Sequence, residues 1–247
     1  MPDYDFRTHR LFVDQTLDGG TVVEPDRAQS NYLLNVLRLR DGAPILLFNG
    51  RDGEWVAEVS VQGRKACHLL VDRQTRPQTP VPALSLMFAP LKQARLEYMV
   101  QKAVEMGAGT LQPVLTQRTQ MRKLNMEKMR AYTVEACEQC GVINLPNLLE
   151  PQILEEALTA QSAETHVIFC DEGAPVANPA DALSALPSHA VCSVLIGPEG
   201  GFTQQERAML MDHPKASRIA LGPRILRADT AAVAALAAVQ MAIGDWS

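Results

Sequence analysis

The chain has 247 residues, of which 47% are hydrophobic and 21% are charged, and it has five cysteines and a formal net charge of −5. This composition is typical of a globular protein that buries a full core without a disulfide or metal staple. We expect a cytoplasmic protein without a membrane anchor. No apolar run reaches the roughly 20 residues of a membrane span, and residues 1–10 lack the apolar stretch of a signal peptide. The cysteines are scattered and odd in number, which favours a reducing compartment.

Residues 1–73 have the pattern of short strands separated by turns. Apolar or alternating runs lie at 10–13, 43–48, 55–61 and 67–72, with the turn pairs Asp41-Gly42, Asn49-Gly50 and Asp52-Gly53 between them. One helix is predicted at about 25–38. Strands at this spacing favour a small β-barrel. Three prolines follow at 73–82 and are typical of a connector, so we predict a first domain at 1–73, a linker at 74–82 and a second domain at 83–247.

In the second domain, strand-like and helix-like patterns alternate. Strands are predicted at 84–89, 111–115, 166–170, 191–196 and 217–221, and helices at 93–106, 126–140, 203–211 and 230–243. Thr203 and Glu206 form a capping box for the third of these helices, and Asp229 or Thr230 is the expected cap of the last. The alternation predicts an α/β fold in which helices cover a mostly parallel sheet.

One segment is basic although the whole chain is acidic. Residues 74–142 carry nine Lys or Arg and five Asp or Glu, and within 116–130 the only acidic residue is Glu127. A local basic stripe can neutralise phosphates of a nucleic acid. The alternative is an ordinary solvated helix face. Charge alone leaves both interpretations open.

Two loops are candidates for a ligand site, because each follows a predicted strand and precedes a helix. Residues 196–202 have the sequence IGPEGGF, whose three glycines let a ligand approach the backbone closely. Residues 221–231 have the sequence LGPRILRADTA, whose two arginines suit a carboxylate or phosphate. The alternative for each is a structural turn without a ligand. Spacing alone predicts a site for an extended ligand at the carboxyl ends of the strands.

At these two loops the sequence closely resembles the bacterial 16S rRNA uracil-N3 methyltransferases of the SPOUT, or trefoil-knotted, superfamily. The resemblance covers the whole chain. Further matching segments are Arg10-Leu11-Phe12, Asn35-Val36-Leu37-Arg38, Phe48-Asn49-Gly50, Lys92, Arg95, Gln101-Lys102-Ala103-Val104-Glu105-Met106-Gly107, Thr116-Gln117-Arg118 and Glu135-Ala136-Cys137-Glu138-Gln139. The chain departs from the family at Asp229, where Glu is usual, and at Asn31, where His is frequent.

The resemblance implies a fold and an activity. The fold is a trefoil-knotted SPOUT methyltransferase domain with a mostly parallel sheet and a C-terminal knot, preceded by a small PUA-like β-barrel that binds RNA. The activity is transfer of a methyl group from S-adenosyl-L-methionine to uracil N3 of 16S rRNA, free or in the small ribosomal subunit, which gives 3-methyluridine. The resemblance also implies a homodimer with the pocket near its interface.

The same resemblance implies site residues. The cofactor contacts are expected at Leu195, Ile196, Gly197, Pro198, Glu199, Gly200, Gly201, Leu221, Gly222, Ile225 and Leu226. The RNA contacts are expected at Arg10, Arg38, Arg118, Arg122 and Lys123.

Three side chains are candidates for catalysis. Uracil N3 carries a proton, so the reaction needs a base or a cation that stabilises the uracil anion. Arg227 is the candidate cation, and Asp229 or Glu199 is the candidate base. The alternatives are that Asp229 only caps its helix and that Glu199 only bonds to local backbone N–H groups.

No metal site is expected, because Cys137 and Cys140 have the spacing of half a zinc site and no second pair follows.

Three other functions are left open. They are a sister methyltransferase acting on tRNA or on another rRNA base, a non-catalytic RNA-binding factor, and an enzyme of small molecules that uses a nucleotide.

Overall fold

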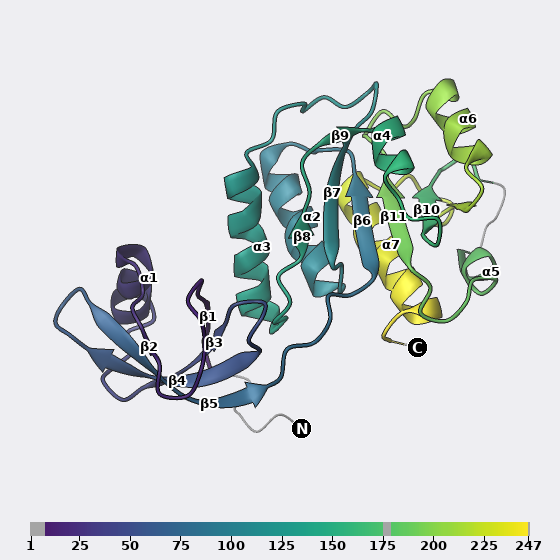
Figure 1. Ribbon diagram of the computed structural model, residues 1–247. Helices are drawn as coiled ribbons and strands as arrows, with labels where there is room; N and C mark the ends of the chain where they lie inside the picture. Colours follow the sequence, from purple (N-terminus) through teal and green to yellow (C-terminus); the bar gives the residue numbers. More distant parts are fainter. Residues whose placement is uncertain (1–7, 175–178, 247) are drawn as a thin grey trace. The chain divides into compact units, whose positions relative to one another are not determined.

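The computed structural model describes residues 8–174 and 179–246, which form two compact units (Figure 1). The first unit comprises the described residues up to Pro80 together with Cys137–Leu145. The second comprises Val81–Ala136 and the described residues from Pro146 on. The domain limits at 1–73, 74–82 and 83–247 stay a prediction.

The first unit is built on a five-stranded sheet in the order β1-β3-β4-β5-β2. β1 and β3 are parallel, and the other pairs are antiparallel. The strands are β1 (Arg10–Phe12), β2 (Val22–Val23), β3 (Pro44–Phe48), β4 (Glu54–Val61) and β5 (Cys67–Arg76). Where one helix was predicted, α1 (Arg27–Asn31) continues into a π-helix, η1 (Tyr32–Val36).

Alternation along these strands builds the core of the first unit. In β5, Cys67, Leu69 and Val71 are buried, and the residues between them are more exposed. In β3, Ile45 and Leu47 are fully buried in the same cluster. A period of two residues with one apolar face is the pattern expected of a sheet that covers its core from one side.

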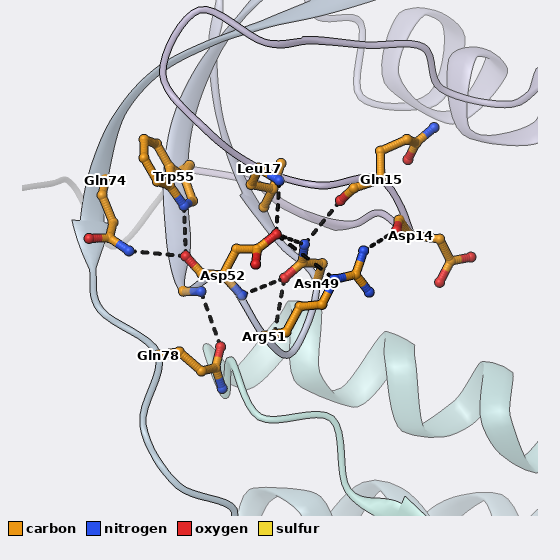
Figure 2. Close-up of polar contacts among 10 residues, drawn as sticks. Asp14, Gln15, Leu17, Asn49, Arg51, Asp52, Trp55, Gln74 and Gln78 are labelled. Atoms are coloured by element: carbon orange, nitrogen blue, oxygen red, sulfur yellow. Dashed lines mark hydrogen bonds and ion pairs between the residues drawn. The ribbon is translucent and has the colours of Figure 1, made fainter.

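The turn between β3 and β4 is held by the side chains of Asn49 and Asp52 (Figure 2). Asp52 Oδ2 accepts hydrogen bonds from the Leu17 backbone N–H at 2.9 Å and from Asn49 Nδ2 at 2.6 Å. Asn49 Oδ1 accepts from the backbone N–H groups of Arg51 and Asp52 at 3.0 and 2.8 Å. The bond from the Leu17 backbone is the main cause that lowers the pKa of Asp52 below its ordinary value of 3.8.

A buried carboxylate ties distant segments of the first unit together. Glu54 is 0% exposed at the start of β4. Arg10 Nε lies 3.1 Å from its Oε2, and Arg76 donates to its two oxygens at 3.0 and 2.6 Å. Arg76 also donates to the Gly141 carbonyl at 2.8 Å. Because each charge in this network has a bonded partner, it can be buried, and it fixes Cys137–Leu145 to the sheet.

The second unit contains a sheet in the order β12-β10-β11-β6-β7-β8, with β9 paired to β7, and all the pairs are parallel. Its strands are β6 (Leu84–Phe88), β7 (Thr110–Leu115), β8 (Asn147–Leu148), β9 (Gln152–Ile153), β10 (His166–Cys170), β11 (Cys192–Ile196) and β12 (Ala216–Ile219). Its helices are α2 (Gln93–Glu105), α3 (Met126–Cys140, which runs into the first unit), α4 (Leu154–Thr159), α5 (Pro179–Leu183), α6 (Gln204–Asp212) and α7 (Ala228–Ile243). In the part of the chain that the structure describes, no helix is long and apolar enough to cross a membrane.

Both faces of this sheet are buried. In β11, Val194 and Ile196 belong to a core cluster shared with α2 and α7, whereas Leu195 belongs to a cluster shared with α4 and α6. In β10, Ile168 and Phe169 divide between the same two clusters. The nearly continuous apolar runs of the sequence are those of strands buried on both sides. The predicted α/β fold with a parallel sheet is confirmed.

The helix ends confirm one prediction and correct another. Thr203 and Glu206 form the predicted capping box of α6. The cap predicted at Asp229 or Thr230 is wrong, because Arg227 adopts the extended backbone of the N-cap, with φ −67° and ψ 153°. Asp229 is therefore the second residue inside α7, where its charge interacts favourably with the helix dipole.

The Asp52 turn makes the stability of the first unit depend on pH. We expect Asp52→Asn to lower the free energy of unfolding by about 1–2 kcal/mol at pH 7, because the bonds from Leu17 and Asn49 lose a charged acceptor. Because folding lowers the pKa of Asp52, its carboxylate stabilises the folded state fully at pH values above the pKa of the unfolded state. This stabilisation is lost as the pH falls through the pKa of the folded state. Urea unfolding of both proteins at pH 7 and pH 3 measures the effect. A stability difference that stays constant between the two pH values would contradict it.

Candidate active site

The parallel strands β10, β11 and β12 end at one edge of the sheet, and the segments that follow them border a cavity of about 340 Å³. Carboxyl ends of strands are where open α/β sheets bind ligands. The cavity wall contains ten of the predicted cofactor and catalytic residues, namely Ile196, Gly197, Pro198, Glu199, Gly201, Leu221, Gly222, Ile225, Leu226 and Arg227. The fold thus brings the two loops found in the sequence to one site.

Three of the predicted residues lie outside the cavity wall. Leu195 is fully buried in β11 among core side chains. Gly200 lies against Arg118, whose Cδ would be 3.5 Å from a Cβ at position 200. The Oδ1 atom of Asp229 is buried and has no hydrogen-bond partner among the described residues.

The shape of the first loop depends on two glycines. A Cβ at Gly197 would lie 2.9 Å from the ring of Phe202, which packs edge-on against Phe169 with the ring centroids 6.4 Å apart. Gly201 has a φ of +67°, and its N–H bonds to the Pro198 oxygen at 2.8 Å. No atom lies within 4 Å of a Cβ built at Gly201. The loop therefore folds onto the core through Phe202 and keeps open backbone at Gly201.

Glu199 makes a long-range ion pair. Its carboxylate pairs with the guanidinium of Arg95, which lies in the first turn of α2. Both side chains line the cavity and are 36% (Arg95) and 40% (Glu199) exposed. Glu199 therefore pairs with Arg95 and not with the local backbone N–H groups that the sequence offered as its alternative partners. Arg95 was not among the predicted site residues, although it belongs to a segment that carries the resemblance.

The second loop brings two arginines to the cavity. Arg224 and Arg227 line its wall and are exposed. Neither side chain has a hydrogen bond or an ion pair with the residues that the structure describes. Gly222, with a φ of +93°, leaves open space beside them. Unpaired guanidinium groups at one wall can bind an anionic ligand or stabilise developing negative charge.

The end of β10 adds a charged cluster that sequence reasoning missed. Asp171 is 4% exposed and accepts hydrogen bonds from Arg207 Nη2 at 2.9 Å and from the Gly173 N–H at 3.1 Å. Arg218 Nη1 lies 3.5 Å from its other oxygen. Burial raises the pKa of the neighbouring Cys170 to about 12, so this thiol in the cavity wall stays protonated. The position of Asp171 after a strand was the available signal, whereas its partners lie far away in the sequence.

The predicted RNA contacts fall into two groups. Arg38, Arg118, Arg122 and Lys123 are exposed. The side chain of Arg10 is only 7% exposed and is paired with Glu54, so the structure gives it a role in the fold and does not present it to RNA. Within residues 8–174 and 179–246, no three His, Cys, Asp or Glu side chains are grouped in a way that could hold a metal ion.

Comparisons with known proteins agree along most of the chain. An RNA methyltransferase domain matches residues 77–240, and an RNA methyltransferase PUA domain matches residues 25–72. Ribosomal RNA small subunit methyltransferase E of Rickettsia conorii is 29% identical over 94% of this chain and 95% of its own length. The protein of the same name from Synechocystis is 30% identical over 86% of this chain and 70% of its own length.

Solved structures show the same likeness. Ribosomal RNA small subunit methyltransferase E from Neisseria gonorrhoeae, bound to S-adenosyl methionine, has a TM-score of 0.85 and 27% identity, and the match covers 98% of this chain and 100% of that one. A Legionella pneumophila protein solved with the bound cofactor SAM has a TM-score of 0.79 and 27% identity, with 96% and 98% covered.

A methyltransferase domain combined with a PUA domain defines the class as the RNA methyltransferases. Within this class, the chain belongs to the family of the ribosomal RNA small subunit methyltransferase E proteins. The family resemblance stated from the sequence motifs is confirmed.

The packing of Phe202 predicts the effect of a side chain at position 197. We expect Gly197→Ala to lower the free energy of unfolding by about 1–3 kcal/mol, because the new Cβ must displace a ring that is packed against Phe169. Gly200→Ala is the matched control, since its Cβ makes only ordinary contacts and is expected to change stability by less than about 0.5 kcal/mol. Chemical denaturation measures both variants, and equal stability of Gly197→Ala and the wild type would refute the packing argument.

Proposed function

We propose that this chain transfers the methyl group of S-adenosyl-L-methionine to N3 of a uridine in 16S rRNA, in the small ribosomal subunit, and forms 3-methyluridine. The observation that carries the proposal is the single cavity built by the IGPEGGF and LGPRILR loops at the carboxyl ends of β11 and β12, the two parallel strands that flank β10. The names of the relatives and the cofactor bound in two structural neighbours support it.

The residues of the cavity fit this cofactor. Its volume of about 340 Å³ falls in the range of sites for small molecules. Ile196, Leu221 and Leu226 give it an apolar wall for an adenosine group. At Gly201 and Gly222, open backbone groups are available for polar contacts. We therefore assign cofactor binding to the eleven residues predicted from the resemblance, with Leu195 and Gly200 acting through the shape of the loop.

When bound, S-adenosylmethionine supplies an electrophilic methyl group on a sulfonium sulfur. The chain must then orient the uracil, accept its N3 proton and stabilise the negative charge that develops on the base. Arg227 is exposed and unpaired at the cavity wall, which suits it for this charge. Asp229 follows two residues later, and its unpartnered Oδ1 is buried outside the cavity wall, so it can accept the proton only if the bound state exposes this oxygen. Glu199 is the weaker candidate for the base, because Arg95 already binds its carboxylate.

RNA contact is assigned to exposed basic side chains outside the cavity. Arg38 belongs to the first unit, and Arg122 and Lys123 belong to the basic segment of the second. Such side chains fix the position of an RNA through its phosphates. The target base must leave its stack to enter the cavity. Arg10 is not included, because it is buried with Glu54.

The proposal includes a cytoplasmic homodimer. The apolar side chains of Ile225, in the second loop, and Met241, near the C-terminal end of α7, are 87% and 68% exposed and support an apolar interface on the second unit. Sedimentation of the purified protein measures the oligomeric state, and a monomer at micromolar concentration would remove this part of the proposal.

Labelled S-adenosylmethionine and small ribosomal subunits that lack the modification test the reaction itself. We expect label in 3-methyluridine after nucleoside mass analysis. Label in another nucleoside would move the protein to a sister activity. A chain that binds the cofactor but labels neither subunits nor free 16S rRNA would contradict the proposed substrate.

The role of Arg227 is tested by Arg227→Ala. We expect kcat to fall about 10²–10³-fold, as when a group that stabilises transition-state charge is removed from other enzymes. Cofactor affinity is expected to stay within about twofold of the wild type, because the charge arises only during the reaction. Arg224→Ala, at the same wall, is the matched control and is expected to have a smaller effect on kcat. Normal turnover by Arg227→Ala would exclude this assignment.

A further inference from the structure

The segment Thr116-Gln117-Arg118 carries the family resemblance, and in the structure it forms a rigid turn after β7. Thr116 and Thr119 are 3% and 6% exposed. The Thr116 N–H donates to Thr119 Oγ1 at 2.8 Å, the two hydroxyls lie 2.9 Å apart, and the Thr119 N–H donates to the Thr116 carbonyl at 3.2 Å. The turn therefore holds the intervening residues in a fixed place.

This turn is bonded to the end of the glycine loop. Glu206, which is 5% exposed, caps α6 by accepting hydrogen bonds from the N–H and the hydroxyl of Thr203 at 2.8 and 2.9 Å. Its second oxygen accepts the Gln117 N–H at 2.8 Å. One buried carboxylate thus joins the turn after β7 to the point where the glycine loop enters α6.

Arg118 reaches from this turn to the middle of the loop. Its Nη1 donates to the Gly200 carbonyl at 2.6 Å. Its Cδ and Cβ would lie 3.5 and 3.7 Å from a Cβ at Gly200, so its aliphatic stem runs alongside the glycine. The neighbouring residue, Glu199, is bound by Arg95. Two guanidinium groups on different elements therefore hold successive residues of the loop.

We propose that Arg118 is a positioning residue that holds the IGPEGGF loop in its binding conformation before any RNA is present. The inference rests on the proposed function, since it concerns the cofactor site of that reaction. A loop with three glycines has many accessible conformations, and fixing one of them costs entropy. Bonds that are already made in the free protein remove this cost from cofactor binding. This role replaces the phosphate contact expected of Arg118 from the sequence.

A phosphate contact and a positioning role for Arg118 predict different results in binding experiments. A phosphate contact changes RNA affinity and its dependence on salt, and it leaves cofactor binding to the free protein unchanged. A positioning role changes cofactor binding without RNA and leaves the salt dependence of RNA binding unchanged. Arg118→Met separates them, because methionine keeps an unbranched stem beside Gly200 and loses every donor.

The experiment is calorimetric titration of the full chain with S-adenosylmethionine, without RNA. We expect Arg118→Met to raise the Kd about tenfold, as for loss of one charge-assisted hydrogen bond. Arg118→Lys, whose ammonium can still donate to the carbonyl, is expected to recover part of the affinity. In turnover, the KM for the cofactor rises in Arg118→Met, while kcat at saturating cofactor stays within about twofold of the wild type.

Lys123→Met is the matched control from the same basic segment, because Lys123 is exposed and has no hydrogen bond or ion pair with the described residues. It is expected to keep the wild-type Kd for the cofactor, to bind RNA more weakly and to lower the salt slope of RNA binding by about one unit. Arg95→Met, which releases Glu199, is expected to weaken cofactor binding in the same direction as Arg118→Met.

Each result decides between the roles. Wild-type cofactor affinity in Arg118→Met, together with a reduced RNA salt slope, would overturn the proposal and return Arg118 to the RNA contacts. If the thermal midpoint of Arg118→Met without cofactor shows that it is unfolded, Arg118→Lys and Arg95→Met give the answer, and wild-type affinity in both overturns the proposal. Failure of the wild type to bind S-adenosylmethionine would defeat the proposed function and this inference with it.

Discussion

The parallel pairing of β10, β11 and β12 is the constraint on which the site depends. Parallel strands end at a common edge, so the loops that follow them must meet there, although they are separated by long stretches of chain. The pairing is secured by burial on both faces of the sheet, where alternate residues such as Val194 and Leu195 enter different core clusters. The cavity is the consequence of this packing, and the glycine and arginine loops supply its chemistry.

The charged groups at the site are of two kinds, those held by a bonded partner and those without one. Buried carboxylates organise the walls: Asp171 holds Arg207 and lies close to Arg218, and Glu206 joins the turn at 116–119 to the start of α6. In the second loop, by contrast, Arg224 and Arg227 have no partner among the described residues. Paired groups keep a fixed geometry, and unpaired guanidinium groups remain available to a ligand or to the base that reacts.

Local patterns in the sequence were enough to predict the longer strands and helices, the capping box at Thr203 and the two loops that form the cavity. They missed the short elements β2, β8, β9, α4 and α5. They were not enough for Arg95, Arg118 or Arg207, because each of these acts through a partner 104, 82 or 36 residues away and leaves no local pattern. Arg10 was expected to contact RNA, since a sequence does not reveal that Glu54 lies beside it. The cap of α7 was misplaced by two or three residues, because the backbone leaves the extended conformation at Arg227, before the residues whose side chains favour a cap.

The contact between Arg118 and Gly200 gives the second glycine of the IGPEGGF loop a meaning of its own. Its φ is not in the left-handed region, so backbone conformation does not require glycine there. The stem of Arg118 lies alongside this position, where a Cβ would be 3.5 and 3.7 Å from the Cδ and Cβ of the arginine. Because residues in contact do not change independently, the effects of substitutions at positions 118 and 200 are expected to be non-additive, and a large side chain at position 200 is expected to cost less stability in a chain that lacks the arginine.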